Sequence, residues 1–175
     1  MTDAFRPIPA RIEMSDAPPA DRRSLRGALG MFATGVTVIT TRKPDGSYAG
    51  FTANSFSSVS LDPPLVLWSL GLDAPSLPAF EASSHYAINV LAANQAHLSQ
   101  HFAMSSADKF AGLGFWPGAG GAPLLPGCCA WFECANEARH PGGDHLIFIG
   151  RVLAYAREEH PPLVFHEGRY RQVAD

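Results

Sequence analysis

Hydroxyl and amide side chains are concentrated between Thr52 and Ser60, where an expected strand ends. The run TANSFSSVS places six such side chains in nine positions. Small hydroxyl groups and free backbone N–H groups bind phosphate oxygens or hydrogen-bond to the polar edge of a planar ring. The run has no Walker-type Gly-Lys-Ser/Thr sequence and is expected to continue as a loop up to Pro63. The alternative is a polar strand end followed by a serine-rich turn.

A second candidate is the segment TGVTVIT, which begins at Thr34. Its glycine, Gly35, allows a ligand to approach the backbone closely. Because side chains alternate between the two faces of a strand, the threonines are expected to face a ligand and the valines the core. An ordinary buried strand is the alternative.

A third candidate is the glycine-rich turn GGDH, which ends at His145 and leads into an apolar strand. A histidine at the entry of a strand can stack on a ligand or hydrogen-bond to it. The alternatives are a simple turn histidine and half of a metal site with His140. Further metal ligands are not apparent in the sequence, so no metal is expected.

One of the two lysines in the chain, Lys109, lies between Asp108 and Phe110. Because lysine is rare in this chain and this one lies beside an aromatic residue, it is a fourth candidate for a site residue. The alternative is an ordinary solvated lysine, which is the commoner situation.

Composition argues against several classes of function. The net charge is −3 and the pI about 6.1, so the chain has no electrostatic footprint for nucleic acid or an anionic membrane. The sequence has neither an apolar run long enough to cross a bilayer nor the apolar core of a signal peptide. The three cysteines fit neither a disulfide framework nor a zinc site, so a reducing cytoplasm is expected. There is no Gly-x-Gly-x-x-Gly for a Rossmann site and no Gly-x-Ser-x-Gly for a serine nucleophile.

The elements that must position these residues are mostly strands. Residues 1–21 are expected to form a flexible N-terminal extension, and residues 22–175 a folded domain. Apolar residues from Leu25 to Phe32 have helical spacing, with Asp21 as a cap and Gly35 as the end. Strands are expected at residues 36–41, 47–56, 65–70, 85–91, 129–138 and 145–156, and in a hairpin over residues 163–172.

Two helices are expected between strands, at residues 76–83 and 94–103, and a long glycine- and proline-rich loop at residues 112–127. Strands joined by hairpins, with few helices between them, favour a closed antiparallel barrel over a doubly wound sheet. The expected fold class is therefore mainly β (α+β), with a few flanking helices.

The order of these motifs resembles the flavin reductase-like family, whose members supply reduced flavin to two-component monooxygenases. The resemblance rests on the runs TGVTVIT and GFTANSFSSVSLDPPLV, followed by INVL, DKF, GDH, GRV, PLV and GRY further along the chain. It extends over residues 22–173 in one order without a large gap.

The resemblance implies a split β-barrel of the FMN-binding type, FMN or FAD as the flavin, and a homodimer with the flavin near the subunit interface. The residues implied to contact the flavin ring and its ribityl chain are Thr34, Gly35, Val36, Thr37, Val38, Thr52, Ala53, Asn54 and Ser55. Those implied to bind the flavin phosphate are Ser57, Ser58, Ser60 and Lys109. His145 is assigned to catalysis by placing the nicotinamide, together with Gly143 and Asp144, and the further cofactor-binding candidates are Phe102, Phe110 and Tyr170.

The function that the resemblance implies is hydride transfer from NADH or NADPH to FMN or FAD, with the reduced flavin passing to a partner oxygenase. Because the flavin carries the difficult chemistry, no acid–base pair or metal cluster is needed. No arginine cluster suited to a 2′-phosphate is evident, which favours NADH. Two alternatives stay open: a tightly FMN-bound oxidase or reductase of the pyridoxamine-phosphate-oxidase-like type acting on an organic substrate, and a non-enzymatic flavin- or haem-binding module.

Overall fold

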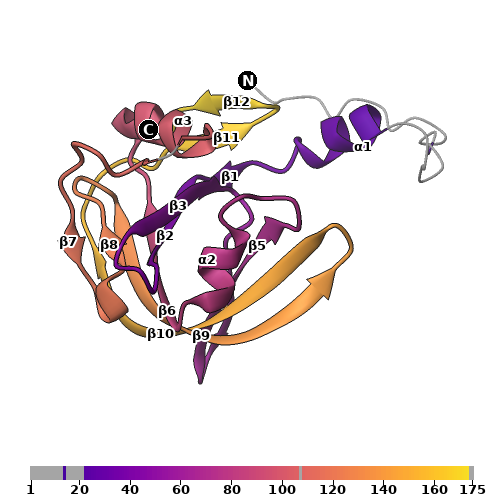
Figure 1. The fold of residues 1–175 in the computed structure, drawn as a ribbon. Coiled ribbons are helices and arrows are strands. Elements are labelled where there is room, and N and C mark those ends of the chain that lie inside the picture. Colours follow the sequence, from indigo (N-terminus) through magenta and orange to yellow (C-terminus); the bar gives the residue numbers. More distant parts are fainter. Residues whose placement is uncertain (1–13, 15–21, 107, 174–175) are drawn as a thin grey trace.

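The computed structural model describes Met14, residues 22–106 and residues 108–173 (Figure 1). The helices are α1 (Arg22–Leu29), α2 (Leu77–Ala82), α3 (Ala96–Ala103) and the short 3-10 helices η1 (Ala93–Gln95) and η2 (Ala119–Gly121). Within these described ranges, no helix is long and apolar enough to span a membrane. The predicted flexible extension, residues 1–21, and the predicted cap Asp21 lie outside the described residues except for Met14.

Seven strands form the main antiparallel sheet, in the order β3-β2-β6-β9-β10-β5-β4. Their bounds are β2 (Thr37–Arg42), β3 (Tyr48–Ala53), β4 (Ser57–Leu61), β5 (Pro64–Gly71), β6 (His85–Val90), β9 (Ala130–Gly142) and β10 (His145–Arg157). A smaller sheet joins β1 (Thr34–Gly35) to the hairpin of β11 (Val164–His166) and β12 (Arg169–Arg171), and β7 (Trp116–Pro117) pairs with β8 (Pro123–Leu124).

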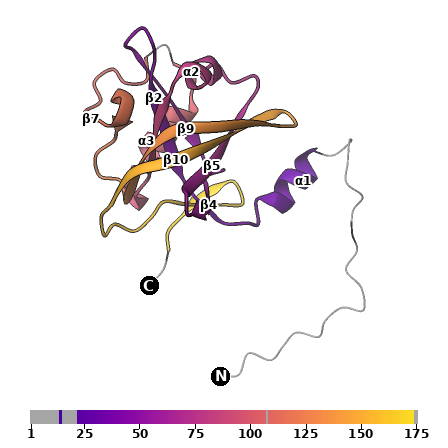
Figure 2. The same ribbon diagram turned by 90° about the horizontal axis from the view of Figure 1, so that it is seen from below.

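The main sheet curls until β3 approaches β5 without a ladder of hydrogen bonds between the two strands (Figures 1 and 2). Aromatic rings fill the opening: the ring centroids of Phe51 on β3 and Trp68 on β5 are 5.5 Å apart. The barrel is therefore split at this point, and β3 is an edge strand. The mainly β split barrel expected from the sequence is confirmed.

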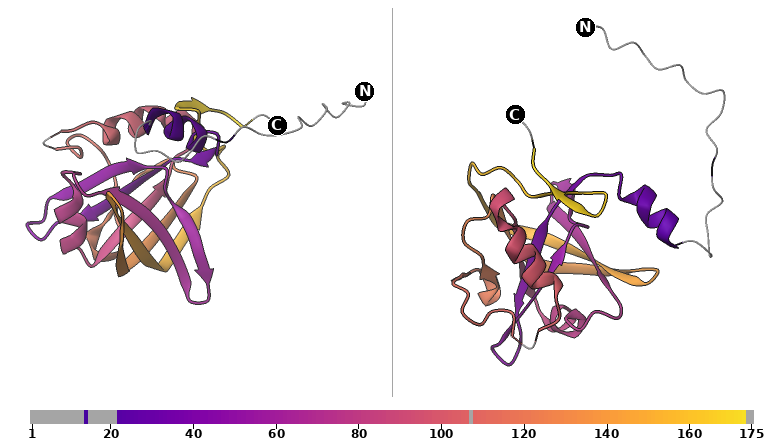
Figure 3. Two further views of the ribbon diagram at one scale, coloured as in Figure 1. Left: turned by 90° about the vertical axis from the view of Figure 1, so that its right-hand side faces the viewer. Right: turned by 90° about the horizontal axis from the view of Figure 1, so that it is seen from above.

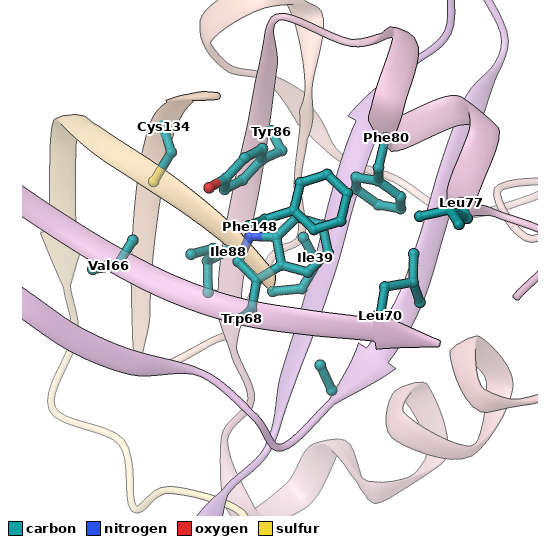
Figure 4. Packing of buried hydrophobic residues seen from close by; sticks show 11 residues of the cluster. Ile39, Val66, Trp68, Leu70, Leu77, Phe80, Tyr86, Ile88, Cys134 and Phe148 are labelled. Atoms are coloured by element: carbon teal, nitrogen blue, oxygen red, sulfur yellow. The ribbon is translucent and has the colours of Figure 1, made fainter. Parts of the chain in front are cut away.

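Buried aromatic and aliphatic side chains fill the interior of the barrel (Figure 4). The rings of Trp68 and Phe148 stack with centroids 4.1 Å apart and an interplanar angle of 4°. Phe80 from α2 and Tyr86 from β6 pack edge-on against Trp68. Gly150 on β10 lies against Tyr86, and a β-carbon at this glycine would overlap the tyrosine hydroxyl. This close packing holds β5 and β10 in a fixed position relative to β3.

A second buried cluster lies between the barrel wall, α3 and the β11–β12 hairpin, which sit together at one end of the molecule (Figure 3). Its fully or nearly fully buried members are Val36, Val38, Leu91, Phe102, Phe110, Leu125, Cys128, Trp131 and Leu163. The cluster fixes α3 against the outer side of β3, where Gly50 leaves room for the ring of Phe102.

Three local expectations differ from the structure. Residues 57–61, expected to be part of a loop, form strand β4, because the free edge of β5 offers hydrogen-bond partners that a serine-rich segment does not find alone. Residues 112–127, expected to be a long loop, contain the β7–β8 hairpin and dock through a hydrogen bond from the Leu125 N–H to the Asn89 side chain. Helix α1 ends at Leu29 rather than near Gly35.

Candidate functional site

Two adjoining cavities lie along the open edge of β3. The histidine cavity, about 480 Å³, is lined by Asn54, Ser55, Ser69, Gly142 and His145 among others. The lysine cavity, about 430 Å³, is lined by Lys43, Tyr48, Ser76, Ser105, Ser106 and Lys109 among others. Phe51, Thr52 and Leu70 line both cavities, so the two adjoin along β3 and are together called the groove.

The groove follows β3 because this strand pairs with β2 on one side only. An edge strand presents a row of backbone N–H and C=O groups that no neighbouring strand uses. One of these groups, the Gly50 carbonyl, accepts a hydrogen bond from Lys109 Nζ at 3.2 Å. The edge therefore offers both donors and acceptors to a planar ligand with polar atoms along one side.

At one end of the groove, Ser55 joins β3 to β5. The Ser69 N–H donates to Ser55 Oγ at 3.0 Å, and the Ser55 hydroxyl donates to the Ser69 carbonyl at 3.3 Å. This pair of bonds closes the split barrel at the point where the β3–β5 opening begins. Ser55 therefore shapes the wall of the histidine cavity, while its neighbour Asn54 is exposed there.

His145 reaches the same cavity from the tip of the β9–β10 hairpin. Gly142 pairs with His145, and Gly143 has a φ of 69°, which suits a glycine in this tight turn. His145 Nδ1 donates to the Asp144 carboxylate at 2.7 Å, which fixes the ring and leaves Nε2 for a ligand. The hydrogen bond from His145, followed by the charge of that ring, lowers the pKa of the exposed Asp144 carboxyl. The sequence-predicted groups at Thr52–Ser55 and at His145 thus meet at one cavity.

Lys109 lies in the middle of the groove. Its Nζ donates to the Phe102 carbonyl at 2.7 Å as well as to the Gly50 carbonyl. An ammonium group has three donors, so one N–H is left for a ligand. Burial lowers the pKa of Lys109. The neighbouring rings of Phe102 and Phe110 pack edge-on with centroids 5.2 Å apart, and both are buried, so they support the wall of the groove.

Tyr170 acts on the groove through α3. Its hydroxyl is 2.8 Å from the Ser99 hydroxyl, and the Ser99 carbonyl accepts a hydrogen bond from Thr52 Oγ1 at 2.6 Å. Tyr170 lines neither of the two cavities. Within the described chain it is therefore a residue that positions Thr52.

The remaining predicted residues lie elsewhere in the chain. Val36, Thr37 and Val38 are buried, and the Thr37 hydroxyl donates to the Ala53 carbonyl rather than facing an open cavity. Thr34 and Gly35 lie on β1, and the buried Thr34 hydroxyl has no hydrogen-bond partner among the described residues. Ser57, Ser58 and Ser60 lie on β4 and line neither cavity, so the described chain does not bring them together with Lys109.

Several residues that line the groove were not predicted from the sequence. These include Ser69, Ser76 and the adjacent pair Ser105 and Ser106, none of which belongs to a recognisable motif. Lys43 carried a usable signal, because it is the other of the two lysines. Both lysines line the same cavity.

The described residues offer no group of three His, Cys, Asp or Glu side chains suited to a metal ion. The cysteines are free thiols, and burial raises the pKa of Cys128 and of Cys134 to about 12. A third cavity, about 250 Å³, lies between the β7–β8 hairpin and β10 and contains none of the predicted site residues.

Comparison with known proteins identifies the family. Residues 29–174 match the model of the flavin reductase like domain. The chain belongs to the flavin reductase-like family. This chain is 47% identical over 148 residues to the FMN reductase (NADH) SmoA of Agrobacterium fabrum, and the match covers 85% of this chain and 84% of SmoA. It is 42% identical over 155 residues to the reductase subunit HsaB of a flavin-dependent monooxygenase from Rhodococcus jostii, covering 87% of this chain and 78% of HsaB.

Other relatives are longer. The reductase component of the flavin-dependent trigonelline monooxygenase of Acinetobacter baylyi is 45% identical over 148 residues, which are 85% of this chain but 48% of that protein. Among solved structures, the NADH:FAD oxidoreductase SgcE6 of Streptomyces globisporus C-1027, in complex with NAD and FAD fragments, superposes with a TM-score of 0.86 at 42% identity. That match covers 93% of this chain and 98% of SgcE6.

Proposed function

We propose that this protein is an NAD(P)H-dependent flavin reductase that passes reduced flavin to a partner monooxygenase. The observation that carries the proposal is the meeting of Asn54, Ser55 and His145 at one cavity, which adjoins the cavity lined by Lys109. The flavin fits this groove because the open edge of β3 supplies backbone donors and acceptors for a ring, and Lys109 keeps one free donor for a phosphate.

The chemistry of the bound pair is hydride transfer from the nicotinamide to the flavin. The chain's own contribution is to hold the two rings in contact. The β3 edge and Asn54 would bind the polar side of the flavin, and Lys109 its phosphate. His145, oriented by Asp144, would hold the nicotinamide through Nε2, which is the free nitrogen of the ring. Since no Rossmann site holds the dinucleotide, these few contacts are expected to dominate its KM.

Anaerobic mixing of the purified protein with NADH and flavin tests the proposal directly. We expect the flavin absorbance near 450 nm to bleach faster than in a buffer control. Steady-state NADH and NADPH oxidation should depend on added riboflavin, FMN or FAD. A rate that is insensitive to added flavin, with stoichiometric FMN retained by the protein, would instead indicate an enzyme that keeps its flavin and acts on an organic substrate. No bleaching at all would contradict the reductase assignment.

The partners of relatives support the transfer of reduced flavin to a second protein. HsaB and the Acinetobacter protein are named as reductase parts of flavin-dependent monooxygenases. SmoA and SgcE6 are named for NADH, which together with the lack of a sequence pattern suited to a 2′-phosphate favours NADH here. The three cysteines are free thiols, which suits a cytoplasmic setting.

We also propose a homodimer, and helix α1 supports it. Leu29, the last residue of the helix, is 67% exposed, Phe32, three residues beyond it, is 79% exposed, and Leu61 on the edge strand β4 is 93% exposed. An eight-residue helix with an uncovered apolar face needs a partner surface to be stable. Light scattering after size-exclusion chromatography should give twice the mass of the chain. Phe32→Glu should shift the protein toward monomer, and a monomeric wild-type protein would contradict the proposal.

A further inference from the structure

Lys43 occupies the far end of the groove from His145. It follows β2 and begins the turn to β3, where its N–H donates to the Ser47 carbonyl at 2.7 Å. Ser47 precedes Gly50, the partner of Lys109, by three residues, which is about 10 Å along an extended chain. The order along the groove is therefore His145 and Ser55, then Lys109, then Lys43.

The ammonium groups of the two lysines differ in their hydrogen-bond and ion-pair partners. Lys109 is held by two backbone carbonyls and has one donor left. Within the described part of the chain, Lys43 forms one ion pair, to Asp45 at 3.9 Å, in a turn where the Asp45 carboxylate also accepts hydrogen bonds from Ser47. Such an exposed pair is weak, so the Lys43 ammonium is available to another anion. Ser76, Ser105 and Ser106 also line this cavity.

We propose that Lys43 is a specificity-determining residue that binds the second phosphate of a dinucleotide flavin, so that the groove distinguishes FAD from FMN. This inference rests on the proposed reductase function. A flavin whose ring lies near Ser55 and whose first phosphate pairs with Lys109 fills only part of the groove. Beyond Lys109, the cavity continues to Lys43 and Tyr48, and only a ligand extended past its first phosphate reaches them. Riboflavin, FMN and FAD carry zero, one and two phosphates and therefore report on each lysine separately.

The test measures the dissociation constants of riboflavin, FMN and FAD by flavin fluorescence, in the wild type and in Lys43→Met and Lys109→Met. Lys43→Met should weaken FAD about fivefold and change FMN and riboflavin less than about twofold. Lys109→Met should weaken both FMN and FAD and leave riboflavin unchanged. Arg157→Met, which removes one exposed positive charge outside the groove, controls for net charge. Asp45→Asn removes the competing carboxylate and should tighten FAD alone.

Equal effects of Lys43→Met on FMN and FAD, or no effect on either, would overturn the assignment while the wild type still reduces flavin. A rise in the KM for NADH without a change in FAD affinity would also overturn it, because the lysine cavity would then hold the dinucleotide. A wild-type protein that binds flavin but does not reduce it would contradict the reductase function. The effect of Lys43→Met on FAD and FMN affinity would still test the role of Lys43, because it is measured by binding alone. If Lys43→Met folds poorly, Asp45→Asn tests the same assignment, because it should lower the dissociation constant of FAD and leave that of FMN unchanged.

Discussion

Strand β3 contributes to two regions of the molecule, the interior of the barrel and the open edge of the sheet. The two regions differ in what surrounds the strand. Phe51 points into the barrel, where it packs against Trp68 and Phe80. Its neighbour Thr52 points the other way and bonds to α3. The interior buries the side chains of Trp68 and Tyr86 almost completely. The edge keeps its backbone groups, hydroxyls and lysines accessible.

The difference shows how this fold separates stability from binding. Packed rings inside the barrel fix the position of β3, and the groove then needs few side chains of its own. Changes inside the barrel should lower the free energy of unfolding, whereas changes along the edge should alter ligand binding in a protein of normal stability. The following substitutions test that separation.

Gly150→Ala should have the largest effect. The new β-carbon would overlap the Tyr86 hydroxyl inside the barrel, and overpacking of this kind costs about 3 kcal/mol of unfolding free energy. Urea denaturation measures the loss. Gly114→Ala is the matched control, because a β-carbon at Gly114 meets no atom within 4 Å. Equal stability of the two variants would show that the interior tolerates change as well as the surface does.

Lys109→Met should weaken FMN binding about tenfold, since it removes a charged donor from a partly buried position. Riboflavin, which has no phosphate, should bind as it does to the wild type. Flavin fluorescence gives both constants. A similar loss for riboflavin would mean that Lys109 supports the shape of the groove through Gly50 and Phe102 rather than binding phosphate.

The charge of Lys109 also predicts a pH dependence. Burial lowers its pKa, so the folded protein loses this positive charge at a lower pH than an unperturbed lysine would. FMN affinity should be fully present below the lowered pKa and fall as the pH rises through it. Riboflavin affinity should show no matching change over the same alkaline range. An FMN affinity that falls only with the ordinary lysine pKa would contradict the effect of burial.

His145→Ala should raise the KM for NADH about fivefold, with flavin affinity nearly constant, because its free nitrogen is assigned to the nicotinamide. Asp144→Asn should have a smaller effect in the same direction, since it leaves the ring in place but weakens its orientation. Steady-state kinetics with saturating flavin separates the two. Weaker flavin binding with an unchanged NADH KM would reverse the roles of the two sides of the histidine cavity.

Tyr170→Phe should have the smallest effect, a change of about twofold in flavin affinity. Its hydroxyl reaches the groove only through Ser99 and Thr52. Thr52→Ser keeps the hydrogen bond to Ser99 and serves as the control. A large loss in Tyr170→Phe would indicate direct contact with the ligand, for instance in a second subunit.

Much of the fold follows from local sequence. Helices α2 and α3, the long strands β9 and β10, and the hairpin that turns at Glu167 and Gly168 all lie close to their predicted positions. Their apolar periodicity and turn residues act over short distances, so the sequence alone carries the signal. Local sequence does not decide whether residues 57–61 form a loop or a strand, because the strand forms by pairing with the free edge of β5.

The order of motifs by itself determined the family and named the hydroxyl-rich run, His145 and Lys109 as site candidates. Only the tertiary structure decided which of them share a groove. The serine-rich run is continuous in sequence, but β3 ends at Ala53 and the chain continues into β4, so Ser55 lines the same cavity as His145 while Ser57, Ser58 and Ser60 do not. Lys43 joined Lys109 because the β2–β3 turn and the segment after α3 converge on the same strand edge, a proximity that no spacing along the chain encodes.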